Sequence, residues 1–153
     1  MLEKMGYANV KTLLASGNVV FETQKSSIPA LIAAIETQFE KTFGFTSSII
    51  LRPLEEIRKL IASDPFKGIT VTPQTRLYVT FLLEKPKSTL KIPYVSESKD
   101  FKILRVTDHE ICSVLTISDN TNSIDSMNIL EKEFGKRITT RNWNTVLKLV
   151  KEK

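Results

Sequence analysis

Apolar side chains recur every three or four residues in four stretches of the chain, which is the spacing of one buried face on an α-helix. Serine, threonine or asparagine precedes three of these stretches, and glycine follows two of them, as expected at helix starts and ends. A fifth helix is predicted to end just before Gly6. The predicted apolar faces run from Leu31 to Phe43, from Leu54 to Ile61, from Ile124 to Phe134 and from Trp143 to Val150.

Alternating polar and apolar residues, and short apolar runs, predict the strands between these helices. Gly17 lies in the short connection between the first two strands, where its freedom to adopt a positive φ suits a hairpin turn. The run 76–83 is apolar on both faces, so we expect that strand inside a sheet. The predicted strands are 10–14, 18–22, 45–51, 76–83, 101–106, 111–117 and 137–139.

The two halves of the chain repeat one order of elements. A helix ends in Phe43-Gly44 in the first half and in Phe134-Gly135 in the second, and each is followed by a strand and an arginine-led helix, at Arg52 and Arg141. This order predicts an α+β protein built from two ferredoxin-like subdomains of the β-α-β-β-α-β type. The predicted division is 1–64 for the N-terminal subdomain, which lacks its opening strand and so suggests a truncation, 65–75 for a connector, and 76–153 for the C-terminal subdomain.

Composition places the chain among soluble globular proteins, with 41% hydrophobic and 25% charged residues. No apolar run reaches the roughly 18 residues that a membrane helix needs, and residues 1–20 do not resemble a signal peptide. We therefore expect a cytoplasmic protein without membrane association. The net charge of +5 and the pI near 9.3 allow a polyanionic partner, which would dock on the basic segment from Lys136 to Lys153.

The sequence gives little support for metal or nucleophilic chemistry. Cys112 is the only cysteine and His109 the only histidine, so a Cys/His zinc site cannot assemble within the chain. His109 lies in a predicted hairpin tip, and Cys112 lies in an apolar strand where it packs as a small hydrophobe. No glycine-rich phosphate-binding motif occurs. We predict no metal site and no cofactor.

The densest group of hydrogen-bonding side chains lies where the last strand meets the last helix. Backbone N–H groups at a helix start beside Arg141 would attract an anion. The polar turn around Gly17 offers a second place where N–H groups face an anion. The candidate ligand-binding residues are therefore Ser16, Asn18, Thr139, Thr140, Arg141 and Asn142.

A structural interpretation explains the same residues without a ligand. In it, Trp143 fills the junction between the subdomains, and Gly17 serves the turn geometry alone. Arg141 and its polar neighbours then satisfy buried carbonyl groups and cap the last helix. Burial of these side chains separates the two interpretations.

Two blocks of the sequence resemble the signature of a known family. The matching residues are Val10-Lys11-Thr12, Ser16-Gly17-Asn18-Val19-Val20-Phe21, Leu51, Asp64-Pro65-Phe66, the strand around Val79–Leu82, and the stretch from Thr139 to Val146. They make the chain similar to the domain-of-unknown-function 1697 family. The resemblance implies a small bacterial protein with two ferredoxin-like subdomains and brings no reaction, cofactor or partner. The family's N-terminal strand and its Arg-Gly-Ile-Asn-Val-Gly-Gly block are lacking here.

Two functional hypotheses follow, and a third is weaker. The first is a binding protein that holds an anionic small molecule near Asn18 and Arg141. The second is an enzyme on a small phosphorylated or carboxylated metabolite, in which the same polar groups stabilise an anionic transition state. Nucleic-acid binding has weak support, because the inner-strand runs 102–106 and 112–117 lack the set of aromatic residues on which RNA-recognition modules stack bases.

Overall fold

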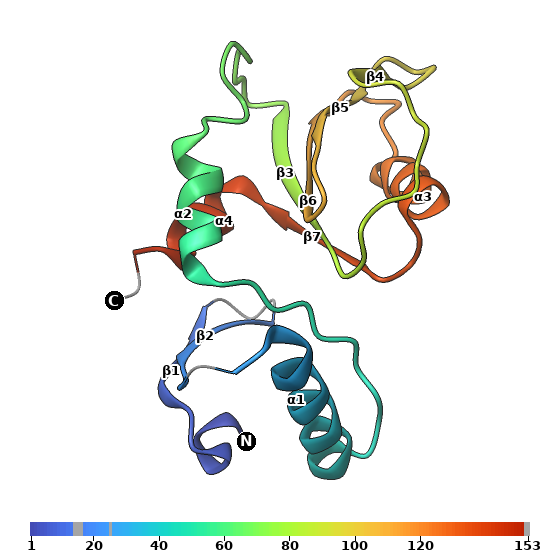
Figure 1. The fold of residues 1–153 in the computed structure, drawn as a ribbon. Helices are drawn as coiled ribbons and strands as arrows, with labels where there is room; N and C mark the ends of the chain where they lie inside the picture. Colours follow the sequence, from blue (N-terminus) through green and yellow to red (C-terminus); the bar gives the residue numbers. More distant parts are fainter. Residues whose placement is uncertain (14–16, 25, 152–153) are drawn as a thin grey trace.

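The protein, described here from a computed structural model, folds into two lobes (Figure 1), and the structure describes residues 1–13, 17–24 and 26–151. The first lobe holds the elements up to α1, and the second holds those from α2 onward. The elements are a 3-10 turn η1 (Leu2–Met5), β1 (Ala8–Leu13), β2 (Asn18–Glu22), α1 (Ile28–Phe43), α2 (Leu54–Ala62), β3 (Thr75–Leu82), β4 (Tyr94–Val95), β5 (Phe101–Val106), β6 (Glu110–Thr116), α3 (Ser123–Phe134), β7 (Ile138–Asn142) and α4 (Trp143–Leu149).

The first lobe pairs a hairpin with a long helix. β1 and β2 are antiparallel, which confirms the predicted hairpin, while the turn residues 14–16 lie outside the described residues. Gly17 has φ 74°, in the left-handed region that glycine adopts without strain. α1 begins after Ser27, whose side chain accepts a hydrogen bond from the backbone N of Ala30 at 3.3 Å, and ends at Gly44 with φ 79°.

The second lobe is organised around a five-stranded antiparallel sheet in the order β4-β5-β6-β3-β7. β3 lies between β6 and β7, which confirms the prediction that this doubly apolar strand is internal. The described residues therefore form a mixed α+β protein with four α-helices and two antiparallel sheets. Within the same residues, none of the helices has both the length and the apolar character required to cross a bilayer.

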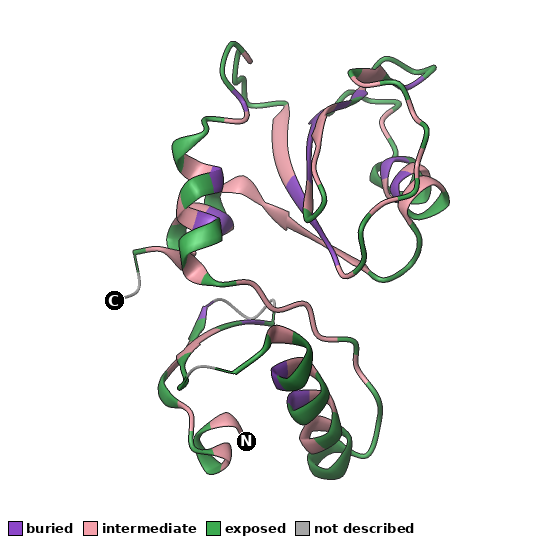
Figure 2. Cartoon of the chain, in the orientation of Figure 1, coloured by how far each residue is buried: buried purple, intermediate pink, exposed green. Residues whose placement is uncertain are grey.

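Helices cover both faces of the larger sheet, with α2 and α4 on one side and α3 on the other (Figures 1 and 2). Alternation along β3 sends Val79 and Phe81 to the first side and Leu82 to the second. α2 falls within the predicted subdomain 1–64, yet its buried side chains pack on this sheet. The first core contains Ile57, Leu60, Phe66, Val79, Phe81, Cys112, Val114 and Val146, and the second contains Leu82, Phe101, Ile103, Ile111, Leu115 and Leu130.

Two segments differ from the expected outline. Residues 45–51 were predicted to form a strand, and this prediction is wrong, because no strand pairs with them among the described residues. Backbone N of Ile49 instead donates to the Glu36 carboxylate of α1 at 2.9 Å. The second segment, residues 83–100, contains the short strand β4 and no helix, whereas the β-α-β-β-α-β outline has a helix there.

Truncating a core leucine of α3 should destabilise the second lobe. Leu130 is 1% exposed, so Leu130→Ala removes apolar contacts and leaves a cavity, which typically costs about 2–5 kcal/mol of unfolding free energy. Ile124→Ala is the matched control, because Ile124 is on the same helix and is 63% exposed. Urea unfolding, monitored by circular dichroism, measures the free energy of unfolding of both variants. Equal losses of this free energy would contradict the assigned core.

Candidate functional site

Strand β7 divides the predicted site residues between the two faces of the larger sheet. Arg141 lies opposite Val79 and Thr139 lies opposite Phe81, so both face the side that carries α2 and α4. Thr140 points the other way, and its hydroxyl lies 2.7 Å from the hydroxyl of Thr80. The period of two along a strand therefore separates Thr140 from its neighbours.

Arg141 joins the two lobes through its guanidinium group. Its Nε donates to Oδ1 of Asn18 on β2 at 2.7 Å, a contact across 123 residues of sequence. Its Nη1 donates to the Thr139 hydroxyl at 2.7 Å and to the Thr140 carbonyl at 3.0 Å. Asn18 is 9% exposed and Arg141 is half-buried, so this contact is partly withdrawn from water. The structure thus brings together Asn18, Thr139 and Arg141.

The remaining predicted site residues have other positions. Asn142 is the N-cap of α4, and its Oδ1 accepts a hydrogen bond from the backbone N of Asn144 at 2.9 Å. The Trp143 ring packs edge-on against Phe66, with 5.1 Å between ring centroids, at the margin of the first core. Ser16 lies outside the described residues. Neither Thr140 nor Asn142 lines the cavity that Arg141 faces.

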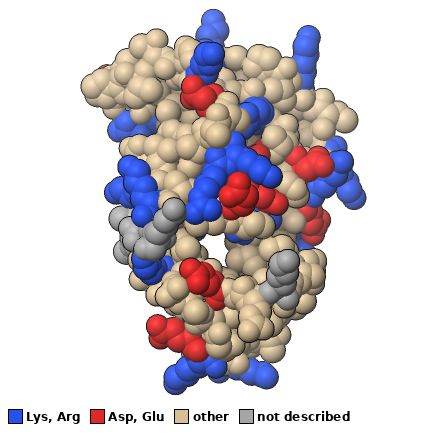
Figure 3. All heavy atoms as spheres, turned by 60° about the vertical axis from the view of Figure 1, so that its left-hand side comes forward, with Lys and Arg blue, Asp and Glu red and all other residues tan. Residues whose placement is uncertain are grey.

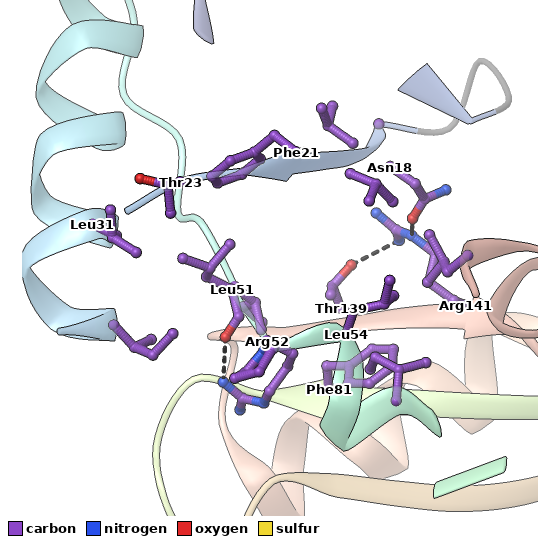
Figure 4. A pocket seen from close by; sticks show the side chains of 18 of the residues that line it. Asn18, Phe21, Thr23, Leu31, Leu51, Arg52, Leu54, Phe81, Thr139 and Arg141 are labelled. Carbon is purple, nitrogen blue, oxygen red and sulfur yellow. Dashed lines mark hydrogen bonds between the residues drawn. The ribbon is translucent and has the colours of Figure 1, made fainter. Parts of the chain in front are cut away.

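A cavity of about 380 Å³ lies between the lobes, bounded by β2, the start of α1, the segment before α2, and β7 (Figure 4). In Figure 3 the molecule is hollowed between the lobes. Most of the lining is apolar. The residues are Gly17, Asn18, Val19, Val20, Phe21, Thr23, Gln24, Ser26, Ile28, Leu31, Ile50, Leu51, Arg52, Pro53, Leu54, Ile57, Phe81, Thr139, Arg141 and Leu149.

Arg52 is a second arginine of this cavity, and it lies on the side away from Arg141 (Figure 4). Its Nη1 donates to the Leu51 carbonyl at 2.8 Å, and its Nη2 donates to the carbonyl of Leu82 at the end of β3. Its Nε is buried and has no hydrogen-bond partner among the described residues. The guanidinium is therefore held by backbone carbonyls, and its buried Nε–H has no acceptor among the described residues.

Both guanidinium groups are partly withdrawn from water. Burial lowers the pKa of Arg52, against the opposing charges of Glu56 and Glu110, and burial also lowers the pKa of Arg141. Arginine remains protonated near neutral pH even after such shifts. Across the described residues, no carboxylate forms a salt bridge with either arginine. Two partly desolvated cations thus face one cavity, and neither has a described carboxylate within salt-bridge distance.

This arrangement is suited to holding an anion beside an apolar group. Partial burial lowers the effective dielectric around the guanidinium groups, which strengthens their attraction for phosphate or carboxylate. The described lining residues include no Asp, Glu, His, Cys, Lys or Tyr, so none of these described side chains is suited to proton transfer near neutral pH. Within the described part of the chain, no group of three or more His, Cys, Asp or Glu residues is arranged so that it could hold a metal ion.

The other groups considered for catalysis lie elsewhere. His109 is exposed in the turn between β5 and β6, where its backbone N donates to the Thr107 hydroxyl at 3.2 Å. Cys112 is completely buried in the first core, and this burial raises the pKa of its thiol to about 11. A thiol that stays protonated is a poor nucleophile.

Sequence reasoning missed Arg52 as a site residue, although a signal for it was present. Arg52 and Arg141 each directly precede the N-cap of a helix, α2 and α4. The repeated order of elements places both arginines before a helix, but only Arg141 was predicted to belong to the site. The apolar members Phe21, Leu51 and Leu54 gave no signal, because an apolar residue that lines a cavity has the same sequence pattern as one that packs in a core.

Comparison with known proteins identifies a family over most of the chain. Residues 1–111 match the family model DUF1697, described as a protein of unknown function. The matched range includes β2, Arg52 and β3, and it ends before β7. No curated protein and no solved structure matches the chain.

The hydrogen bond between Asn18 and Arg141 should couple the two residues energetically. Hydrogen bonds to charged groups contribute about 1.5–3 kcal/mol, so a double-mutant cycle of Asn18→Ala and Arg141→Ala should give a coupling of about 1–3 kcal/mol. Urea unfolding of the wild type, the two single variants and the double variant measures this coupling energy. The control cycle pairs Arg141→Ala with Asn122→Ala, a cap on α3, and should be additive. A coupling no larger than in the control would contradict the bridge between the lobes.

Cys112 should react slowly with thiol reagents in the folded protein. Its pKa is about 11 against an ordinary 9.0, so the thiolate fraction at pH 8 is lower by about two powers of ten. Release of the chromophore from a dithiobis-nitrobenzoate reagent measures the rate. The rate should rise about tenfold for each pH unit. The same protein in urea is the control, and equal rates in the two states would show that the thiol is accessible.

Proposed function

The chain belongs to the DUF1697 family, and we propose that it is a binding protein for a small organic anion held in the cleft between the lobes. One observation carries the proposal. Arg52 and Arg141 line the same cavity, both are partly desolvated, and no salt bridge from a described residue neutralises either. A cation that is removed from water without a counter-charge is costly, and an anionic ligand would offset that cost.

The lining indicates the chemical class of the ligand. A phosphate or carboxylate would accept hydrogen bonds from the guanidinium groups, and the Thr139 hydroxyl is within 2.7 Å of one of them. Phe21, Leu51 and Leu54 would contact an apolar or ring-shaped part of the same molecule. Small-molecule sites typically combine such an apolar lining with a few convergent polar groups. The ligand would therefore be a phosphorylated or carboxylated metabolite with an apolar portion.

Binding is favoured over the two alternatives by the form of the cavity. An enzyme acting by general acid–base catalysis needs a titratable group near the substrate, and the described lining supplies only arginines. A volume of about 380 Å³ lies in the range for small-molecule pockets, which favours a metabolite over a nucleic acid. We therefore propose that the cleft binds an anionic ligand without catalysing a reaction on it.

We also propose that each half of the chain derives from a ferredoxin-like unit. In the second half, β3, β5, β6 and β7 are the four strands of such a unit, with neighbours in the order β5-β6-β3-β7. α3 connects the last two strands, and residues 83–100 replace the first helix. In the first half, β1, β2 and α1 would correspond to β5, β6 and α3, and residues 45–51 would correspond to β7.

Phenyl phosphate is a suitable first probe, because it combines an anion with a ring. It should bind the protein, and Arg52→Gln and Arg141→Gln should each weaken binding about tenfold or more, since a charged hydrogen bond contributes about 1.5–3 kcal/mol. Isothermal titration calorimetry measures the affinities, and circular dichroism verifies folding. Phenol, which lacks the anion, should not bind measurably.

The matched control for these variants is Arg58→Gln. Arg58 lies on α2 close in sequence to Arg52, but it pairs with Glu55 at 3.5 Å and does not line the cavity. The Arg58→Gln variant should bind phenyl phosphate with the wild-type affinity. Equal weakening by Arg58→Gln would indicate a general charge effect, and unchanged binding by Arg52→Gln would refute the proposed site.

A further inference from the structure

We infer that the ligand of the cleft carries two anionic groups, one for Arg141 and one for Arg52, joined by an apolar portion that crosses the cavity. This inference rests on the proposed function, because it concerns the same cavity, and it adds the number and spacing of the anionic groups. It is drawn from the separate contacts that hold the two arginines and from the lining between them.

The guanidinium group of Arg141 is held on the β7 side of the larger sheet. Its Nη1 donates to the Thr139 hydroxyl at 2.7 Å and to the Thr140 carbonyl at 3.0 Å, and both acceptors belong to β7. Its Nε donates to Asn18 of the first lobe at 2.7 Å. These hydrogen bonds keep the cation over β7, which pairs with one edge of β3.

Arg52 is held on the opposite side of β3. Its Nη2 donates to the carbonyl of Leu82, the last residue of that strand. The backbone N of Leu82 donates to the His109 carbonyl at 2.9 Å, and the N–H and C=O groups of one residue in an antiparallel strand point to the same neighbour. Leu83 turns its N–H the other way, to the Arg137 carbonyl at 3.2 Å. The Leu82 carbonyl and its bound guanidinium therefore lie toward the β5–β6 hairpin, away from β7.

The two anchoring positions are separated by β3 itself. β6 and β7 pair with opposite edges of β3, and neighbouring strands lie about 4.8 Å apart, so about 10 Å separates β6 from β7. Figure 4 shows the two arginines on opposite sides of the cavity. A single phosphate or carboxylate group is smaller than this separation. One such group therefore accepts hydrogen bonds from one guanidinium at a time.

The lining between the arginines is apolar and matches that separation in size. Phe81 of β3 and Leu54 of α2 line the cavity from the second lobe, and Phe21 of β2 lines it from the first. A sphere with the cavity's volume of about 380 Å³ is about 9 Å in diameter. An apolar wall offers no partner for a charge, so the anionic groups of a ligand would lie at the arginines, with its apolar portion between them.

The charges of the lining also favour two anionic groups. Arg52 and Arg141 are the charged side chains among the described lining residues, so a ligand with one anionic group leaves one partly desolvated cation without an ion pair. Burial lowers the pKa of Arg52, and the charges of Glu56 and Glu110 oppose this shift, but neither carboxylate lies within salt-bridge distance. The phosphate of phenyl phosphate is attracted by the more distant arginine through its double charge. A second anionic group would bind that arginine directly.

Two ligands that differ in charge at one end test the inference. 4-Carboxyphenyl phosphate has anionic groups at both ends of a ring, and 4-carbamoylphenyl phosphate has nearly the same shape with a neutral amide in place of the carboxylate. Isothermal titration calorimetry on the whole chain should show that the carboxylate binds at least tenfold more tightly, since a hydrogen bond between charged groups contributes a factor of about ten or more. This comparison needs no protein variant.

Variants of the protein then show whether both arginines are used. In Arg52→Gln and in Arg141→Gln one arginine remains for two anionic groups, so the affinity ratio of the two ligands should fall to about one. Arg58→Gln removes the same charge from a residue that pairs with Glu55 and does not line the cavity, so this control should keep the tenfold ratio. Circular dichroism verifies that each variant is folded.

The outcomes separate this inference from the proposed function. Equal affinities of the two ligands for the wild type, with phenyl phosphate still bound, would overturn the inference and leave the anion cleft in place. A tenfold ratio that survives Arg52→Gln would also overturn it, because the carboxylate would then bind elsewhere. A ratio that falls equally in Arg58→Gln would overturn it as a general charge effect. If none of the three phosphates binds, the proposed function fails together with the inference.

Discussion

The junction between the lobes depends on the guanidinium group of Arg141. A buried donor without an acceptor is costly, so a half-buried guanidinium must find oxygen atoms from the protein or a ligand. Here Asn18 supplies one from β2, and Thr139 and Thr140 supply two from β7. Because Asn18 belongs to the other lobe, satisfying this cation also positions β2 over the larger sheet.

The same requirement explains why the cleft is suited to an anion. Arg141 has hydrogen-bond acceptors on one edge, but neither it nor Arg52 has a salt bridge from a described residue. Neutral acceptors satisfy the geometry of a guanidinium without neutralising its charge, and at Arg52 the charges of Glu56 and Glu110 offset the effect of burial only in part. The structural and ligand-binding interpretations of Arg141 are therefore compatible, since the contacts that fix its position also direct its charge into the cavity.

The two lobes differ in the number of paired strands in their sheets. In the second lobe, β3 has neighbours on both edges and helices cover both faces, so its core is well buried. In the first lobe, β2 pairs only with β1 among the described residues, and the backbone N of Ile49 donates to the side chain of Glu36. An alternating sequence supplies the tendency to extend, but a strand forms only where another strand offers backbone partners. This is the physical reason why the prediction for 45–51 failed although its pattern was correct.

The sequence by itself determined the local elements. Periodicity, caps such as Ser27 and Asn122, and the glycine at 44 specify the helices, because these are interactions between near neighbours. It also indicated Asn18, Thr139 and Arg141 as polar groups of interest. Only the tertiary structure decided that Thr140 turns away, that Asn142 is used as a cap, and that Arg52 joins Arg141 across the cleft. Those outcomes depend on strand pairing and on contacts between lobes, which connect residues far apart in the chain.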